Sequence, residues 1–226
     1  MNCQGKGNIN MENQALEEIA AAIAHEVKNP LTLVSFNLDI LESSDERQEI
    51  YKNYAMIRKE LKKINDIIMD FIYLTGSCSD RKCAVYIRPL LDELKQDLSV
   101  AMPDIELSIT YDCKDKAVYG HESGIKIMFG NIVKNAAEAM DFAGKLQIST
   151  KEKDNIINIS FKDNGSGLDK SIRDKIFKEQ FTTKPEGSGL GLSICKKIAK
   201  EHKGDFTLRE SIDGGCVATV KLPMVK

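Results

Sequence analysis

The fold of the N-terminal third follows from residues 50–71, whose sequence is IYKNYAMIRKELKKINDIIMDF. Its apolar residues alternate spacings of four and three, and such a seven-residue repeat is typical of helices that pack as in a coiled coil. The repeat consists of Ile50, Tyr54, Ile57, Leu61, Ile64, Ile68 and Phe71. The segment therefore predicts a helix with one continuous apolar stripe.

The segment before it, residues 16–41, has a similar pattern, with apolar residues three or four positions apart. These are Leu16, Ile19, Ile23, Val27, Leu31, Val34, Leu38 and Leu41. The polar sequence ESSDERQE separates the two segments, which predicts an antiparallel helical hairpin. Because one hairpin cannot cover its own stripe, we expect two chains to form a four-helix bundle. The alternative is a hairpin that packs against the rest of its own chain.

After residue 75 the pattern becomes mixed. We expect helices over residues 88–101, 125–140 and 190–201, and strands over residues 105–111, 145–150, 156–161, 205–209 and 217–222. Grouped strands with helices between them predict an α+β sandwich, in which helices cover one sheet. The predicted divisions are a polar N-terminal segment (1–14), the hairpin (15–75), a linker (76–84) and the sandwich domain (85–226).

Composition excludes several classes of protein. The 32 Lys and Arg residues nearly balance the 34 Asp and Glu residues, which gives no electrostatic case for binding nucleic acid or an anionic membrane. No apolar run approaches the roughly 20 residues that span a bilayer, and the polar N-terminus is no signal peptide. The six cysteines form no CxxC pair. We therefore expect a cytoplasmic protein with reduced thiols, without a transmembrane segment or a nucleic-acid partner.

His25 is a candidate nucleophile. It lies two residues after Ile23, so on a helix it points away from the apolar stripe. Glu26 could accept a hydrogen bond from one ring nitrogen and leave the other nitrogen free to attack. Asn29 lies one turn away on the same face, and Pro30 removes a backbone donor, which typically costs about 3 kcal/mol inside a helix. The alternative is a surface histidine without a role.

A polar row lies on the helix predicted near residues 125–140. Asn131, Asn135 and Glu138 are spaced at i, i+4 and i+7, so they share one face. Because Mg²⁺ prefers oxygen ligands and keeps several waters, a hydrated Mg²⁺ with a triphosphate would suit this face. An amphipathic helix with a solvated polar face is the alternative.

Two glycine-rich loops follow. The sequence DNGSG (163–167) comes directly after a predicted strand, so its carboxylate could accept a hydrogen bond from an amine such as that of adenine, beside glycines that allow close approach. The sequence GSGLGL (187–192) opens the last predicted helix, and free amides at a helix N-terminus bind anions. An ordinary turn and a flexible surface loop are the respective alternatives.

Together these motifs resemble one family. The box AHEVKNPLT (24–32) resembles the HExxN phosphoacceptor box of histidine kinases, most closely those of the Gram-positive sporulation phosphorelay. The N, G1, F and G2 boxes of the histidine-kinase ATPase domain resemble NIVKNAAEA (131–139), DNGSG (163–167), IFKEQFTTK (176–184) and GSGLGL (187–192). The segment GGCVATVKLP (214–223) is similar to the closing strand of that domain.

The resemblance implies a Bergerat-type ATP-binding sandwich and an ATP:protein-histidine phosphotransferase. His25 would take the γ-phosphoryl group with help from Glu26, and Asn29 would position a water when a partner regulator is dephosphorylated. Asn135 would contact Mg²⁺ and Asp163 the adenine of ATP. Further implied nucleotide contacts are Asn131, Gly165, Gly167, Lys184, Gly187, Gly189, Leu190, Gly191 and Thr219. The implied partners are a second copy of the chain and the receiver domain of a response regulator.

The chain departs from the family pattern at Glu179 and Gln180, where the F box usually has Pro-Phe. We assign no role to His121, and we expect His202 at the surface. Two other functions stay open: an ATP-driven clamp on the same superfold, or a non-enzymatic dimeric scaffold regulated by nucleotide. The clamp would leave His25 and Glu26 without a purpose.

Overall fold

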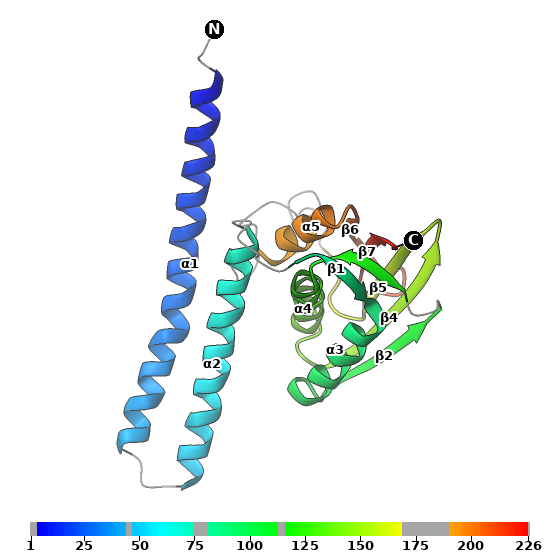
Figure 1. The fold of residues 1–226 in the computed structure, drawn as a ribbon. Helices are drawn as coiled ribbons and strands as arrows, with labels where there is room; N and C mark the ends of the chain where they lie inside the picture. Colours follow the sequence, from blue (N-terminus) through cyan, green and yellow to red (C-terminus); the bar gives the residue numbers. More distant parts are fainter. Residues whose placement is uncertain (1–3, 44–46, 75–80, 113–115, 169–189, 226) are drawn as a thin grey trace. The chain divides into compact units, whose positions relative to one another are not determined.

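The computed structural model describes residues 4–43, 47–74, 81–112, 116–168 and 190–225 (Figure 1). These residues fall into two compact units, which we describe separately. The first contains the two N-terminal helices, and the second contains all later helices and strands.

The first unit is an antiparallel hairpin of α1 (Gln4–Ser43) and α2 (Arg47–Leu74), which lie side by side in Figure 1. The helix α1 begins within the segment predicted as a polar N-terminal stretch, and it continues through Pro30, which is buried. Ile23, Ile57 and Ile67 are buried in this unit. No helix in the described part of the chain is long and apolar enough to cross a membrane.

The hairpin buries only part of its apolar surface. Another row stays open on both helices: Leu31 is 47% exposed, Leu38 47%, Tyr54 54%, Leu61 50% and Ile68 43%. These residues belong to the predicted stripes. The hairpin therefore presents an uncovered apolar row along its length.

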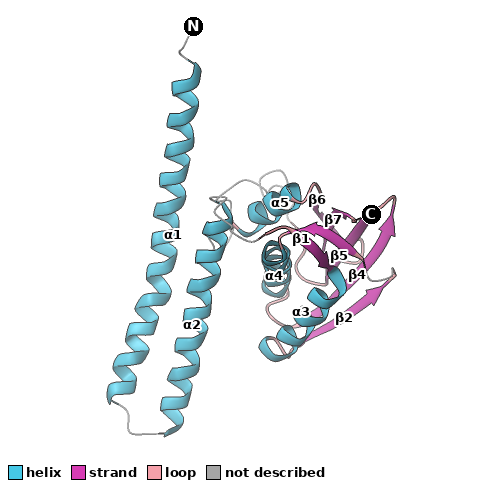
Figure 2. Cartoon of the chain, viewed as in Figure 1, coloured by secondary structure: helices cyan, strands magenta, loops and turns pink. Residues whose placement is uncertain are grey.

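The second unit is an α+β sandwich, as predicted (Figure 2). Its elements are β1 (Cys83–Tyr86), α3 (Ile87–Ala101), β2 (Ile105–Tyr111), β3 (Ala117–Gly120), α4 (Glu122–Ala139), β4 (Gly144–Lys153), β5 (Ile156–Asp163), α5 (Gly191–Glu201), β6 (Asp205–Glu210) and β7 (Cys216–Pro223). Five strands form one sheet in the order β2-β4-β5-β7-β6, in which β2 and β4 are parallel and the other pairs antiparallel. The short strands β1 and β3, which we did not predict, form a separate antiparallel pair.

Alternation along β5 positions the site. Ile157, Ile159, Phe161 and Asp163 are buried, whereas the residues between them are partly exposed. The Phe161 ring lies 5.4 Å from the ring of Phe129 on α4, so this row faces the helices. Asp163 is thus the last member of a core-facing row, with the apolar core on one side and the strand end on the other.

Candidate functional site

Asp163 is the fixed centre of the candidate site. Its side chain is only 6% exposed, and its Oδ1 atom accepts two backbone hydrogen bonds. One comes from the N–H of Gly165 at 2.9 Å, and the other from the N–H of Cys216 at 3.0 Å. Hydrogen bonds to a charged acceptor are strong, so the carboxylate is held in one orientation.

The loop after Asp163 is packed against its neighbours. The Asn164 Oδ1 accepts a hydrogen bond of 2.8 Å from the Lys145 N–H, and the Ser166 N–H donates one of 3.0 Å to the Ala139 carbonyl. A Cβ at position 165 would lie 2.7 Å from the carbonyl carbon of Ala139, which leaves no room for a side chain. Gly167 has a φ of +79°, which glycine adopts readily. Both glycines are therefore required by the path of the loop.

The helices α4 and α5 meet beside this loop. Asn131, Asn135 and Glu138 are half-buried on α4, whereas Ile132 and Val133 are buried. This polar row follows the predicted face. The start of α5 lies close to it, since a Cβ on Gly191 would be 3.2 Å from the Asn131 Oδ1. Leu190 is the N-cap residue of α5, and the amides at a helix N-terminus are suited to binding an anion.

The predicted nucleotide-site residues that the structure describes outside α4 lie in two groups beside that helix, and one residue lies apart from both. Leu190 and Gly191 lie at the start of α5, and Gly165 and Gly167 lie after Asp163. Thr219 does not join them. Its Oγ1 is 3.4 Å from the Ser160 Oγ, on the sheet face opposite to Asp163. Lys184, Gly187 and Gly189 lie outside the described residues.

Sequence reasoning missed Gly215 and Cys216. Cys216 begins β7, is 7% exposed and bonds to Asp163 through its amide. Burial, and then the nearby Asp163 carboxylate, raise the pKa of the Cys216 thiol from its usual 9.0 to about 11. The alternation of buried residues in β7 could have placed Cys216 on the core-facing side, but its contact with Asp163 depends on the pairing of distant strands.

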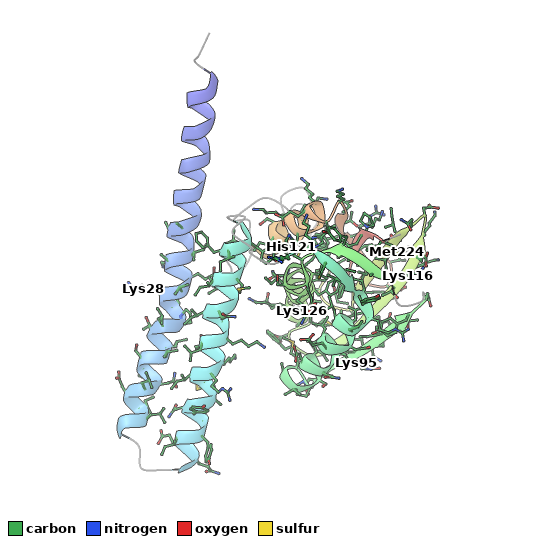
Figure 3. The ribbon with its side chains drawn as sticks, in the orientation of Figure 1. Lys28, Lys95, Lys116, His121, Lys126 and Met224 are labelled. Atoms are coloured by element: carbon green, nitrogen blue, oxygen red, sulfur yellow. The ribbon has the colours of Figure 1, made fainter. Side chains whose placement is uncertain are left out.

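The expectation for His202 was wrong. Its side chain is buried, at 4% exposure, because it continues the buried face of α5 one turn beyond Ile198. His121, labelled in Figure 3, precedes α4 and is partly exposed. The two rings lie edge to face with centroids 6.1 Å apart.

His25 in α1 is exposed, as its position off the stripe predicts. Glu26 is partly buried, and Asn29 is exposed. Lys28, labelled in Figure 3, is also exposed. An exposed imidazole can reach a second reactant, which a core histidine could not.

Within the described ranges, no three His, Cys, Asp or Glu side chains gather in a way that would hold a metal ion. Among the described residues, Cys83, Cys195 and Cys216 form no disulfide bond. The side-chain amides of Asn131 and Asn135 remain suitable for a cation that a substrate phosphate also binds.

Comparison with protein families gives two matches. Residues 15–75 match the model of the His Kinase A (phospho-acceptor) domain. Residues 120–226 match the model of the histidine kinase-, DNA gyrase B-, and HSP90-like ATPases. The first range contains His25, and the second contains the site around Asp163.

Two curated proteins show the extent of similarity. Sporulation kinase C of Bacillus subtilis (strain 168) is 33% identical over 213 residues, which cover 92% of this chain and 49% of that protein. Signal transduction histidine-protein kinase AtoS of Escherichia coli (strain K12) is 31% identical over 216 residues, which cover 92% of this chain and 35% of that protein. The chain thus spans about half or less of the length of these relatives.

Two solved structures of a histidine kinase resemble this chain. Histidine kinase ThkA, in complex with response regulator protein TrrA, has a TM-score of 0.68 and 26% identity, covering 96% of this chain and 64% of that chain. The catalytic domain of ThkA has a TM-score of 0.59 and 29% identity, covering 63% of this chain and 95% of that chain.

Proposed function

Since this chain belongs to the histidine kinase family, we propose that it is a catalytic core that transfers the γ-phosphoryl group of ATP to His25. The observation that carries the proposal is the combination of three features in one chain. An exposed histidine stands in an HExxN box, a buried carboxylate is held by two amides, and the N-terminus of α5 lies against Asn131 of α4. The first feature supplies a phosphate acceptor, and the other two supply a site suited to the phosphate donor.

The site around Asp163 would hold ATP. The Asp163 carboxylate would accept a hydrogen bond from the adenine amine, because the amides of Gly165 and Cys216 leave its second oxygen available. The N-terminus of α5 would face the phosphates, with the positive end of its dipole toward them. Lys184, Gly187 and Gly189 stay predictions as further phosphate contacts.

Mg²⁺ fits the polar row on α4. The Asn131 Oδ1 lies next to the start of α5, and Asn135 follows one turn later on the same face of α4. Mg²⁺ is commonly bound by a few protein oxygens together with substrate phosphates. When bound, the ion would neutralise charge on the transferring phosphate. The asparagine amides would orient the triphosphate so that its last phosphorus is exposed to attack.

The chemistry at His25 is an in-line displacement. One imidazole nitrogen attacks the γ-phosphorus, a nitrogen–phosphorus bond forms, and the bond to the bridging oxygen breaks, so that ADP leaves with the electron pair. The ring loses a proton, which the neighbouring Glu26 carboxylate can accept. Catalysis consists chiefly of positioning the two reactants and stabilising charge.

A second copy of the chain would cover the open row on the hairpin. The row extends over both helices, from Leu31 and Leu38 on α1 to Leu61 and Ile68 on α2. Burying such a row against its own copy gives a four-helix bundle, in which the apolar surface is removed from water. The dimer would present a phosphoacceptor histidine from each chain.

The phosphoryl group would then pass to an aspartate in the receiver domain of a response regulator. ThkA, whose structure resembles this chain, was solved in complex with response regulator protein TrrA. Because Asn29 is exposed one turn from His25, it can hold a water near the acceptor when the regulator is dephosphorylated.

The test is transfer of label from γ-labelled ATP. Wild-type protein with Mg²⁺ should gain an acid-labile, alkali-stable phosphate, and mass spectrometry should place it on His25. His25→Gln should remove the label while ATP binding and dimerisation stay unchanged, since His25 lies outside both the apolar row and the nucleotide site. Glu26→Gln should slow labelling only. Phosphate on a serine or threonine, or normal labelling of His25→Gln, would show that the proposal is wrong.

A further inference from the structure

The backbone at Gly215 passes very close to Asp163. Gly215 has a φ of +72°, and a Cβ added there would lie 2.7 Å from the Oδ1 of Asp163 and would also collide with its carbonyl oxygen. Any other residue would have to move the start of β7 away from the end of β5. The next residue, Cys216, donates the 3.0 Å amide bond to Oδ1. Close approach at Gly215 is therefore the condition for this hydrogen bond.

The amides of Gly165 and Cys216 determine which oxygen of the Asp163 carboxylate can bind a ligand. Both hydrogen bonds that the described residues make to Asp163 end on Oδ1, one from the loop after β5 and one from β7. An acceptor bonded in this way by two fixed amides cannot rotate without losing them. The Oδ2 atom is left as the acceptor for a ligand.

Gly215 is also held through its own carbonyl group. The Ser211 N–H donates a 2.9 Å hydrogen bond to the Gly215 carbonyl oxygen. Gly167, in the loop after Asp163, also packs near Gly215, since a Cβ there would lie 3.7 Å from the Gly215 carbonyl oxygen. The backbone of Gly215 and Cys216 thus forms the second side of the site.

We infer that Gly215 is a specificity-determining positioning residue, which makes the carboxylate of Asp163 read the 6-amino group of a purine nucleotide. This inference rests on the proposed function, because it requires that the site bind ATP. Adenine presents an amine at this edge, whereas guanine presents a carbonyl. A site that places a fixed acceptor opposite the amine loses affinity for any analogue without it.

Gly214 provides a matched control. It has a φ of +89°, which strains any other residue, as the φ of Gly215 does, but no atom lies within 4 Å of an added Cβ. Gly214→Ala therefore introduces the backbone strain without the collision. The comparison with Gly215→Ala isolates the contact with Asp163.

The experiment measures the affinities for ATP and for purine riboside triphosphate, which lacks the 6-amino group, by competition with a fluorescent nucleotide. Wild type and Gly214→Ala should bind ATP about tenfold tighter than the analogue, as expected for one charge-assisted hydrogen bond. In Gly215→Ala the ratio should fall toward one. Circular dichroism establishes that each variant is folded.

Failure of the proposed function and failure of the inference about Gly215 give different results. A wild type that does not bind ATP would refute the proposed function itself. If wild type binds ATP and folded Gly215→Ala weakens both nucleotides equally, or neither, the ratio is unchanged and the inference about Gly215 is wrong.

If Gly215→Ala does not fold, the inference is tested by amide NMR of the wild type instead. The resonances of the Gly165 and Cys216 amides should shift differently on binding ATP and on binding purine riboside triphosphate, because only ATP bonds to their shared carboxylate. Identical Cys216 shifts in the two complexes would overturn the inference.

Discussion

The Nε2 atom of His202 accepts a 2.9 Å hydrogen bond from the backbone N–H of His121, which joins the end of α5 to the start of α4. Its Nδ1 lies 2.7 Å from the carbonyl oxygen of Ile198. Both bonds form only in the neutral ring with its hydrogen on Nδ1, because a protonated ring has no acceptor. His202 therefore ties together the two helices that carry the candidate site, and it does so only while uncharged.

Stability should consequently depend on pH through His202. Burial is the main cause that lowers the pKa of His202 below 6.5, and electrostatic interactions with His121 and Lys82 act in the same direction, against the opposing effects of the Ile198 carbonyl and Glu201. Above 6.5 both the folded and unfolded states are neutral. Below it the unfolded state binds the proton first, so the free energy of unfolding falls until the lower folded pKa is passed.

Calorimetry at about pH 7.5 and about pH 5.5 checks this prediction. The unfolding temperature of the wild type should drop more between the two values than that of His202→Gln, because every other group titrates in both proteins. An equal drop in the two proteins would contradict the role given to His202.

Gly120 should be intolerant of any side chain. A Cβ at this position would collide with the His202 ring, whereas a Cβ at Gly130, exposed in α4, meets nothing within 4 Å. Gly120→Ala should destabilise the protein by more than about 1 kcal/mol, since His202 must move and leave the His121 amide unpaired. Gly130→Ala should stabilise it by about 0.5–1 kcal/mol because alanine is the better helix former. Urea unfolding followed by circular dichroism measures both, and a stable Gly120→Ala protein would contradict the packing described.

Periodicity predicted most of this fold, and its failures have physical causes. The helix and strand patterns of the sandwich were long enough to show their period, and these elements are confirmed. The strands Cys83–Tyr86 and Ala117–Gly120 are too short for a period to appear, and they exist because they pair with each other.

The candidate site was predicted in its local parts only. Asp163, Gly165 and Asn131 could be proposed from the sequence because each belongs to a short motif. Cys216 was missed because its contact with Asp163 arises from the register of β7 on β5. His202 was expected at the surface because no motif includes it, although its place four residues after Ile198 continues the buried face of α5.

The open row on the hairpin predicts a dimer that one charge can break. Leu61 is 50% exposed in the single chain and lies near the middle of the row. Leu61→Glu should dissociate the dimer, since the bundle would bury a carboxylate without a partner. Sedimentation velocity measures the change, and Gln48→Glu, at an exposed position of α2, is the control with the same new charge. A Leu61→Glu protein that remains dimeric would exclude this row as the interface.

The alkylation rate of the Cys216 thiol should depend on the negative charge of Asp163. Its pKa of about 11 is set first by burial and second by the Asp163 carboxylate. Since the thiolate is the reactive form, iodoacetamide at about pH 8.5 should alkylate exposed Cys83 much faster than Cys216. Asp163→Asn should lower the pKa of Cys216 and speed its alkylation, because the asparagine keeps an oxygen for the two amides but removes the negative charge.

Asp213→Asn provides the control for this change. It removes an exposed carboxylate from the neighbouring turn that is not among the causes of the Cys216 shift, so alkylation of Cys216 should stay at the wild-type rate. Peptide mass spectrometry follows each cysteine separately, and Cys83 calibrates the reagent in every sample. Bound ATP should slow alkylation of Cys216 and leave Cys83 unaffected, because the nucleotide would cover the side of the site where β7 begins. Equal rates for Cys216 in wild type and Asp163→Asn would show that the carboxylate charge does not act on the thiol.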